Sequence, residues 1–195
     1  MIDPGHGGKD AGILSTQGME KTFDLDLSLI VRNLLQKNNH MKVILTREKD
    51  QTLSLDERAA FANAAGAAIF VSIHGSSGTE SHVYTQDISG DVGELAAQTK
   101  PVSGDFLGFE TGSEQQELVW GLQQAAHIQE SGALGRQLAR QLSGNNSAEP
   151  LQAPLFGLRA VDSAAVLIEV GMDQDRTKVA ESITGGIEHY VRDFR

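Results

Sequence analysis

No cysteine occurs anywhere in the 195-residue sequence. Disulfides and thiolate ligands are therefore excluded, so any bound metal must be held by histidine and carboxylate side chains. A protein without disulfides fits the cell envelope and the cytosol equally well. The missing thiols thus limit the metal chemistry without fixing the compartment.

The sequence also lacks a long apolar run and a basic cluster. No stretch approaches the roughly 20 apolar residues that cross a bilayer, so we expect no membrane span. Acidic residues outnumber basic ones by 26 to 16, and the formal net charge is −10. Because nucleic-acid binding depends on clustered lysine and arginine, we expect no nucleic acid among the partners.

A secretory leader is missing too, since the basic, apolar and small-residue regions of a signal peptide do not occur. Met1–Asp3 is very short for a first strand, so we expect that the chain has been trimmed and that a leader or another domain preceded it. A length of 195 residues suits one domain with an ordinary core. We find no repeat and no linker, and predict a single domain over residues 1–195.

Strand and helix signals alternate along the chain. Nearly continuous apolar runs predict buried strands over 42–46, 67–73 and 164–170. A helical stripe is formed by Phe23, Leu27, Ile30 and Leu34, which leaves Asp24 off the stripe. Further helices are expected over 56–65, 118–142 and 178–191. This alternation predicts an α/β fold with a largely parallel sheet between helices.

Two details of this pattern are less regular. The helix over 118–142 contains Gly132 and Gly135, where we expect it to break into two pieces. Residues 85–112 are polar and glycine-rich, and a loop that long in a compact domain is usually functional or disordered. We therefore expect an insertion over about 85–126.

The opening segment MIDPGHGGKDAG contains His6 among four glycines. Glycines at this density allow the backbone to turn sharply or to approach a bound group closely, and a histidine among them suggests that this group is a metal.

Reactive side chains fall at the ends of three predicted strands. His6 follows the first strand, His74 follows the run over 67–73, and Glu169 lies near the end of the run over 164–170. Active sites of open α/β sheets gather at this edge, and Glu20, before the first long helix, is a fourth candidate. Two histidines and a glutamate are a ligand set of catalytic zinc, and another carboxylate would serve as general base.

Each of these residues also has a plain structural explanation. A single histidine after a strand is often only hydrogen-bonded, and Glu20 suits a solvated helix start. Glu169 is harder to explain, because a carboxylate in an apolar strand is costly unless it is paired or bound to a metal.

Five segments, taken in order, resemble the zinc-dependent N-acetylmuramoyl-L-alanine amidases of the Amidase_3 family. They are IDPGHGGKDAG, GMEKTFDLDLS, VILTREKDQTLSLDERAAFANAAGA, AIFVSIHG and VLIEVG. The resemblance implies a mixed sheet of about six strands between helices. It implies that His6, Glu20 and His74 bind Zn²⁺ and that Glu169 is the catalytic carboxylate.

The resemblance further implies cleavage of the amide bond between N-acetylmuramic acid and L-alanine in peptidoglycan. The substrate places the protein in the periplasm or elsewhere in the cell envelope outside the cytoplasmic membrane. We expect a monomer, and the resemblance is compatible with an activator protein as a partner.

The sequence departs from the family pattern in three places. Gly75-Ser76 replaces Ala-Asn, and Met172-Asp173-Gln174-Asp175 replaces a segment with Phe and Ser-Asn, which puts substrate preference in question. The insertion is longer than the minimal pattern. Its segment GSEQQELVWGLQQ, residues 112–124, either blocks the site as a helix or shapes the substrate cleft.

Four further residues are candidates for supporting roles. Asp3 and Asp10 could accept a proton from the metal-binding histidines and so fix their tautomers. Arg47 and Arg58 either contact substrate carboxylates or form structural ion pairs, and we favour the structural pairs.

Three alternative functions stay open at this point. The chain could be another zinc hydrolase, such as a carboxypeptidase acting on stem peptides. It could instead be a non-catalytic module that binds the cell wall. It could also be a structural α/β domain without metal, which a metal assay would decide.

Overall fold

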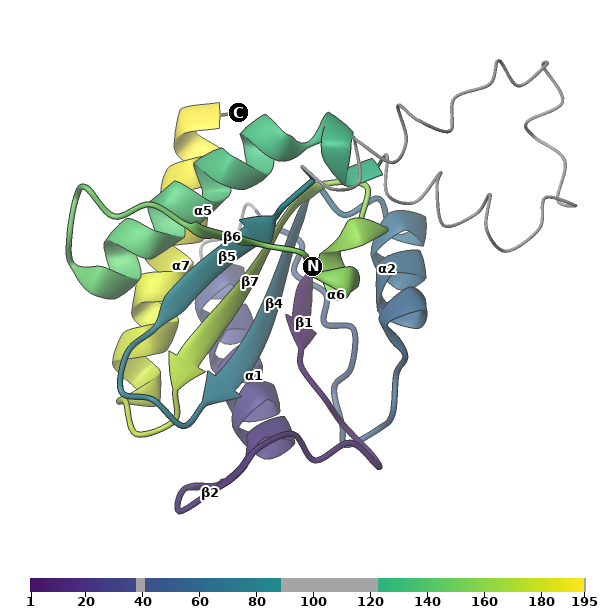
Figure 1. The fold of residues 1–195 in the computed structure, drawn as a ribbon, viewed down its shortest axis with the longest axis vertical. Coiled ribbons are helices and arrows are strands. Elements are labelled where there is room, and N and C mark those ends of the chain that lie inside the picture. The colour runs from purple at the N-terminus through teal and green to yellow at the C-terminus, as the bar shows by residue number, and fades with distance from the viewer. Residues whose placement is uncertain (38–40, 89–122, 195) are drawn as a thin grey trace, which may run out of the picture.

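The computed structural model describes residues 1–37, 41–88 and 123–194 (Figure 1). The strands are β1 (Ile2–Pro4), β2 (Leu14–Ser15), β3 (Gly18–Met19), β4 (Ile69–Ser76), β5 (His82–Gln86), β6 (Leu151–Ala153) and β7 (Ala164–Gly171). The helices are α1 (Glu20–Lys37), α2 (Leu55–Ala64), α5 (Ile128–Ser143), α6 (Phe156–Arg159) and α7 (Arg176–Phe194).

Five strands form the main sheet in the order β1-β4-β7-β5-β6, and β2 pairs with β3 in a small antiparallel hairpin. All neighbours in the main sheet are parallel except β5, which runs antiparallel to β7. The predicted α/β class with a mostly parallel mixed sheet is confirmed. Because β1, β4 and β7 are parallel, their carboxyl ends meet at one edge of the sheet.

Helices cover both faces of this sheet, and each face has its own apolar core (Figure 1). On one face, α1, α5 and α7 contribute buried side chains such as Leu27, Leu134 and Ile183. On the other face, the shorter α2 and α6 contribute Ala59 and Leu158. Burial on both faces explains why the sequences of β4 and β7 are nearly continuous apolar runs.

The prediction of a strand over residues 42–46 is wrong. This segment makes a single parallel bridge between Leu45 and Ile2. The Ile2 N–H donates to the Ile44 carbonyl over 2.9 Å, and the Thr46 N–H donates to the Ile2 carbonyl over 3.0 Å. Since β1 has only three residues, it offers too short an edge for a longer ladder. The main sheet therefore has five strands in the described residues, against about six expected.

The predicted position of the break in the later helix is also wrong, although residues 123–126 and α5 do form two helical pieces. The helix α5 runs unbroken through Gly132 and Gly135, and the turn lies at His127, before α5 begins. A Cβ atom at Gly135 would lie 3.0 Å from Pro150 and 3.1 Å from Thr85. Here glycine permits close packing of a helix and does not interrupt it. Residues 118–122 of the predicted helix lie outside the described residues.

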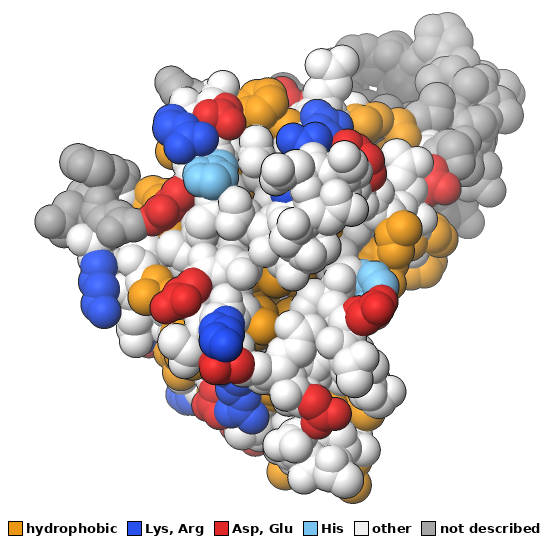
Figure 2. All heavy atoms as spheres, turned by 90° about the vertical axis from the view of Figure 1, so that its left-hand side faces the viewer, with side chains coloured by type: hydrophobic (Ala, Val, Ile, Leu, Met, Phe, Trp, Pro, Cys, Tyr) orange, Lys and Arg blue, Asp and Glu red, His pale blue; other side chains and the backbone are white. Residues whose placement is uncertain are grey.

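The predicted insertion lies largely outside the described residues, as does most of the segment 112–124. In the ranges that the structure does describe, no helix has both the length and the apolar character needed to cross a bilayer. Figure 2 shows the side of the molecule on the left of Figure 1, where acidic and basic side chains are interspersed. That face presents no continuous basic surface, in keeping with the net charge of −10.

Candidate metal centre

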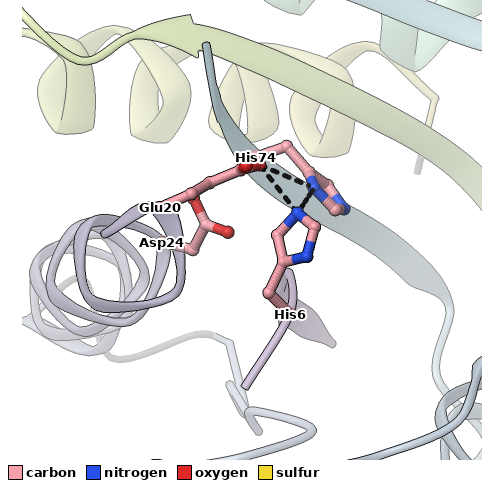
Figure 3. Close-up of side chains that lie close together, drawn as sticks. All are labelled: His6, Glu20, Asp24 and His74. Carbon is pink, nitrogen blue, oxygen red and sulfur yellow. Dashed lines mark hydrogen bonds and ion pairs between the residues drawn. The ribbon is translucent and has the colours of Figure 1, made fainter. Parts of the chain in front are cut away.

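Four side chains that can bind a metal converge at the carboxyl edge of the sheet (Figure 3). His6 lies in the loop after β1, His74 lies in β4, and Glu20 and Asp24 lie in the first turns of α1. One ligand atom from each residue lies within 4.8 Å of the others. Within the described ranges, no other group of three or more such side chains comes this close.

Three of the four ligand atoms form a compact triangle. His6 Nε2 lies 2.9 Å from Glu20 Oε1. His74 Nδ1 lies 3.2 Å from both of these atoms. Ligand bonds of 2.0–2.1 Å in tetrahedral zinc sites place neighbouring ligand atoms about 3.3 Å apart. The two ring nitrogens and the carboxylate oxygen therefore fit one face of a zinc tetrahedron, and the predicted ligands His6, Glu20 and His74 are brought together.

The glycine-rich loop makes this approach sterically feasible. A Cβ atom at Gly5 would lie 2.5 Å from the His74 ring and 2.7 Å from Asp24 Oδ2. Gly12 has a φ of 63°, and a Cβ atom there would lie 2.5 Å from Glu20 Oε2. His6 itself has a positive φ of 54°, which is uncommon outside glycine and typical of functional sites.

The buried side chain of Arg47 holds the glycine-rich loop in place through hydrogen bonds to the backbone. Its guanidinium donates to the carbonyl oxygens of Pro4 over 3.1 Å, Gly5 over 2.5 Å and Lys21 over 2.8 Å. These bonds tie the end of β1 to the start of α1, which are the two segments that carry His6 and Glu20. Arg47 is thus structural, as favoured above.

Arg58 and Asp3 form a second buried structural unit. Arg58 Nη1 donates to Asp3 Oδ1 over 2.7 Å, and Nη2 donates to the His6 carbonyl over 2.7 Å. Asp3 also accepts hydrogen bonds from Thr46 and Ser72. The prediction that Asp3 fixes a histidine tautomer is therefore wrong, because these donors occupy its carboxylate.

Asp10 does contact one of the two candidate metal-binding histidines. His6 Nδ1 lies 2.7 Å from Asp10 Oδ2, and the Gly12 N–H donates to Asp10 Oδ1 over 3.0 Å. A proton on Nδ1, shared with Asp10, leaves the lone pair of His6 Nε2 free for a metal. Of the two aspartates predicted for this role, Asp10 is thus the one that contacts a histidine.

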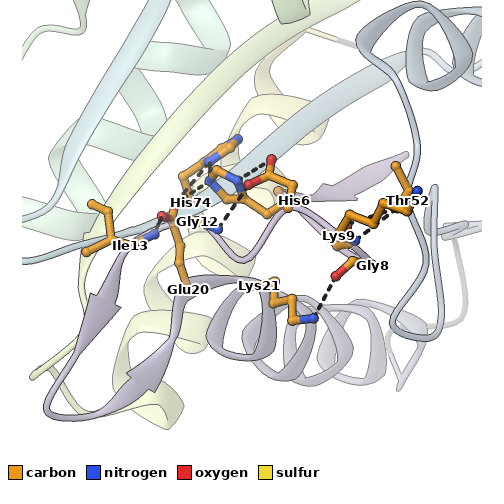
Figure 4. Close-up of polar contacts among 12 residues, drawn as sticks. His6, Gly8, Lys9, Gly12, Ile13, Glu20, Lys21, Thr52 and His74 are labelled. Carbon is orange, nitrogen blue, oxygen red and sulfur yellow. Dashed lines mark hydrogen bonds and ion pairs between the residues drawn. The ribbon is translucent and has the colours of Figure 1, made fainter.

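Glu20 is the acceptor at the centre of the site (Figure 4). Its Oε2 accepts from the Ile13 N–H over 2.7 Å, while its Oε1 faces both rings. Burial alone would raise the pKa of Glu20, but hydrogen bonds with His6 and His74 outweigh it and bring the pKa to about 2. The hydrogen bond to Glu20 likewise raises the pKa of His6 to about 9.

Asp24 is the site residue that the sequence pattern missed. It is completely buried, with 0% of its surface exposed, although the helical stripe placed it outside the core. Burial, and after it the charge of Glu20, raise its pKa to about 8, although the charge of His6 and the nearby Gly75 N–H oppose the rise. The spacing of four residues between Glu20 and Asp24 was the signal that could have found it, since such pairs share a helix face.

Glu169 lies beside the four-residue cluster and is not part of it. It pairs in register with His74 on the adjacent strand, so both side chains stand on the same face of the sheet. It is half-buried, and the Tyr84 hydroxyl donates to its Oε2 over 3.2 Å. A carboxylate in this position can exchange a proton with a group bound next to the cluster.

Sequence comparisons agree with this geometry. The chain matches the Amidase_3 family, described as N-acetylmuramoyl-L-alanine amidase, over residues 1–189. It is 30% identical to the N-acetylmuramoyl-L-alanine amidase AmiC of Escherichia coli O6:H1 over 99% of its own length. The chain spans 52% of the length of that relative.

Solved structures share the fold at lower identity. The catalytic domain of CwlV, an amidase from Bacillus (Paenibacillus) polymyxa, has a TM-score of 0.62 and 24% identity, and the match covers 98% of this chain and 96% of that one. The CwlD amidase of Clostridioides difficile, solved in complex with the GerS lipoprotein, has a TM-score of 0.67 and 21% identity over 98% and 97% of the two chains. These two likenesses concern the fold.

Proposed function

Since the chain belongs to the Amidase_3 family of N-acetylmuramoyl-L-alanine amidases, we propose that it is a zinc-dependent hydrolase of peptidoglycan. The bond cleaved is the amide between N-acetylmuramic acid and L-alanine. Residues 1–195 form one catalytic domain in this proposal, with residues 85–126 as an insertion within it.

The observation that carries the proposal is the triangle of His6 Nε2, Glu20 Oε1 and His74 Nδ1, with sides of 2.9 to 3.2 Å. Two neutral imidazoles and one carboxylate leave a fourth tetrahedral position for water or substrate. Zinc held by these residues would supply Lewis acidity, which would lower the pKa of a water and polarise the amide carbonyl.

The protein residues around the triangle divide the remaining tasks. Asp10 keeps the proton of His6 on Nδ1 and so presents Nε2 as the ligand. Glu169 accepts a proton from the attacking water and delivers it to the departing alanine nitrogen, which needs it to leave as an amine. The hydrogen bond from Tyr84 orients the Glu169 carboxylate.

The substrate also defines the surroundings of the protein. Peptidoglycan places it in the cell envelope, outside the cytoplasmic membrane. An accessory protein is part of the proposal, with support from the structural neighbour that was solved with a lipoprotein. A monomeric state stays a prediction.

The decisive experiment is digestion of purified peptidoglycan by zinc-loaded and chelator-treated protein, with the products identified by mass spectrometry. We expect stem peptides with a free L-alanine N-terminus, and only with zinc. Cleavage elsewhere in the stem would favour the carboxypeptidase alternative. Zinc binding without any product would favour a site blocked by residues 112–124, and deletion of that segment would then separate this state from a wall-binding module.

Two variants test the residue assignments. Glu169→Gln should keep zinc and lose about 10²- to 10⁴-fold in turnover, because a proton acceptor is missing. His74→Ala should lose zinc and turnover together. The matched controls are Glu181→Gln and His189→Ala on α7, which carry the same changes outside the candidate site. Ordinary activity of Glu169→Gln would contradict its assignment.

A further inference from the structure

We propose that Asp24 is a fourth metal-binding group of this site, in addition to His6, Glu20 and His74. The inference rests on the metal centre of the proposed function and concerns how that centre holds its ion. Asp24 contacts the metal through the water in the fourth tetrahedral position, or directly as a fifth ligand beside that water, and it strengthens the binding of Zn²⁺.

The first argument is the state of the Asp24 carboxylate. Its surface is 0% exposed, and neither of its oxygens accepts a hydrogen bond within the described residues. A buried carboxylate without a partner is costly, and buried charges are normally paired or coordinate metals. A bound cation would let this carboxylate keep its charge, whereas without one burial favours the protonated form.

The second argument is where this carboxylate points. Asp24 lies one turn after Glu20 on α1, and its ligand atom lies within 4.8 Å of those of Glu20, His6 and His74 (Figure 3). Like charges four residues apart destabilise a helix, unless a cation lies between them. A single ion at the triangle would neutralise both carboxylates at once.

The third argument is that the nearby arginines are engaged elsewhere. The hydrogen bonds of Arg47 go to backbone carbonyl oxygens. Arg58 pairs with Asp3, and Arg176 pairs with Asp26. No salt bridge to Asp24 is formed within residues 1–37, 41–88 and 123–194. Since no side-chain cation in these ranges pairs with Asp24 directly, the metal position is the place from which a cation could contact its oxygens.

The fourth argument is the space that Gly5 leaves open, because glycine has no side chain. A Cβ atom there would lie 2.7 Å from Asp24 Oδ2 and 2.6 Å from His74 Nδ1. Glycine at this position thus keeps open the space between the fourth carboxylate and the triangle. With two carboxylates and two neutral imidazoles, the site balances the charge of a divalent cation.

The test is the affinity for Zn²⁺ alone, measured by competition with a chromophoric chelator. Asp24→Asn keeps the shape and removes the charge, and we expect its affinity to fall by about tenfold or more, as for other supporting groups of metal sites. The control is Asp26→Asn, the same change two residues further along α1, which should bind Zn²⁺ like the wild type.

A spectroscopic readout distinguishes a ligand from a merely structural residue. The visible absorption of the Co²⁺-loaded protein reports coordination, and we expect it to change in Asp24→Asn and to stay unchanged in Asp26→Asn. Asp24→Ser provides a second variant in case the first does not fold.

The possible failures are separable. If the wild type binds no Zn²⁺, the proposed function fails and this inference fails with it. If the wild type binds Zn²⁺ and both Asp24 variants bind it within twofold of the wild type, only the role of Asp24 is overturned.

Discussion

Along the chain, Asp3 in β1 precedes the loop that carries His6 and Asp24 in α1 follows it, and both are buried, with exposed fractions of 3% and 0%. Their surroundings differ completely. Asp3 accepts hydrogen bonds from Thr46 over 2.5 Å, from Arg58 over 2.7 Å and from Ser72 over 2.9 Å. Asp24 accepts none within the described residues.

In our proposal, this difference separates a structural carboxylate from a functional one. Burial is the same for both, so burial alone does not mark a site. The hydrogen bonds of Asp3 complete a closed network that holds the end of β1. The lone pairs of Asp24 have no hydrogen-bond donor in the described part of the chain and lie next to the triangle of His6, Glu20 and His74.

The largest effect expected from this contrast is on stability. Asp3→Asn removes the charge that compensates buried Arg58 and should lower the free energy of unfolding by about 3–5 kcal/mol, the range typical of breaking a buried pair. Asp24→Asn should not destabilise the chelator-treated protein. Urea denaturation of the two variants measures the difference.

The control for this prediction is Asp162→Asn, which removes the charge from an exposed pair with His127. Exposed pairs contribute less than about 1 kcal/mol. Equal losses from Asp3→Asn and Asp162→Asn would show that the network around Asp3 does not hold β1 in the way described.

The second prediction concerns pH and the chelator-treated protein. The pKa of Asp24 rises from 3.8 to about 8 on folding, so the folded protein holds this proton more tightly. The stabilisation of the folded state by this proton is complete below about pH 4 and is lost as the pH rises towards 8. The pKa of His6 rises from 6.5 to about 9, which extends the loss to higher pH.

Glu20 works in the opposite direction, because its pKa falls from 4.5 to about 2. Its stabilisation is present above about pH 4.5 and is lost as the pH falls towards 2. The difference in unfolding free energy between the wild type and Asp24→Asn isolates the aspartate. It should grow in favour of the variant between pH 4.5 and 8, and a difference independent of pH would contradict the assignment.

The parts of the molecule that the sequence predicted well depend on local pattern and on topology. The runs over 67–73 and 164–170 became β4 and β7, since apolar runs of that length suit strands covered on both faces. Parallel strands bring their carboxyl ends to one edge of the sheet. The sequence alone therefore predicted that His6 and His74 lie close together.

The missed features depend on contacts between distant segments. Asp24 was assigned to the solvent side because a helical stripe assumes that polar residues face water. Asp3 and Asp10 were equivalent in sequence, and only the approach of Arg58 from another helix separates them. The single bridge at Leu45 likewise reflects the short β1 and not the sequence of the segment itself.

Glu169 is a third carboxylate and lies between these extremes. It is half-buried and accepts one hydrogen bond, from the Tyr84 hydroxyl over 3.2 Å. It should therefore be held in orientation without being locked into a network, as a group that moves a proton must be. Tyr84→Phe removes only this contact and tests how much the orientation contributes.

The effect of Tyr84→Phe should be the smallest of the series. A single hydrogen bond contributes about 1 kcal/mol, so we expect kcat to fall by roughly fivefold while KM and the affinity for Zn²⁺ stay unchanged. Tyr190→Phe on α7 is the control and should leave kcat as it is. A loss as large as that of Glu169→Gln would mean that Tyr84 takes part in the proton transfer itself. An unchanged kcat would mean that the strand β7 alone orients Glu169.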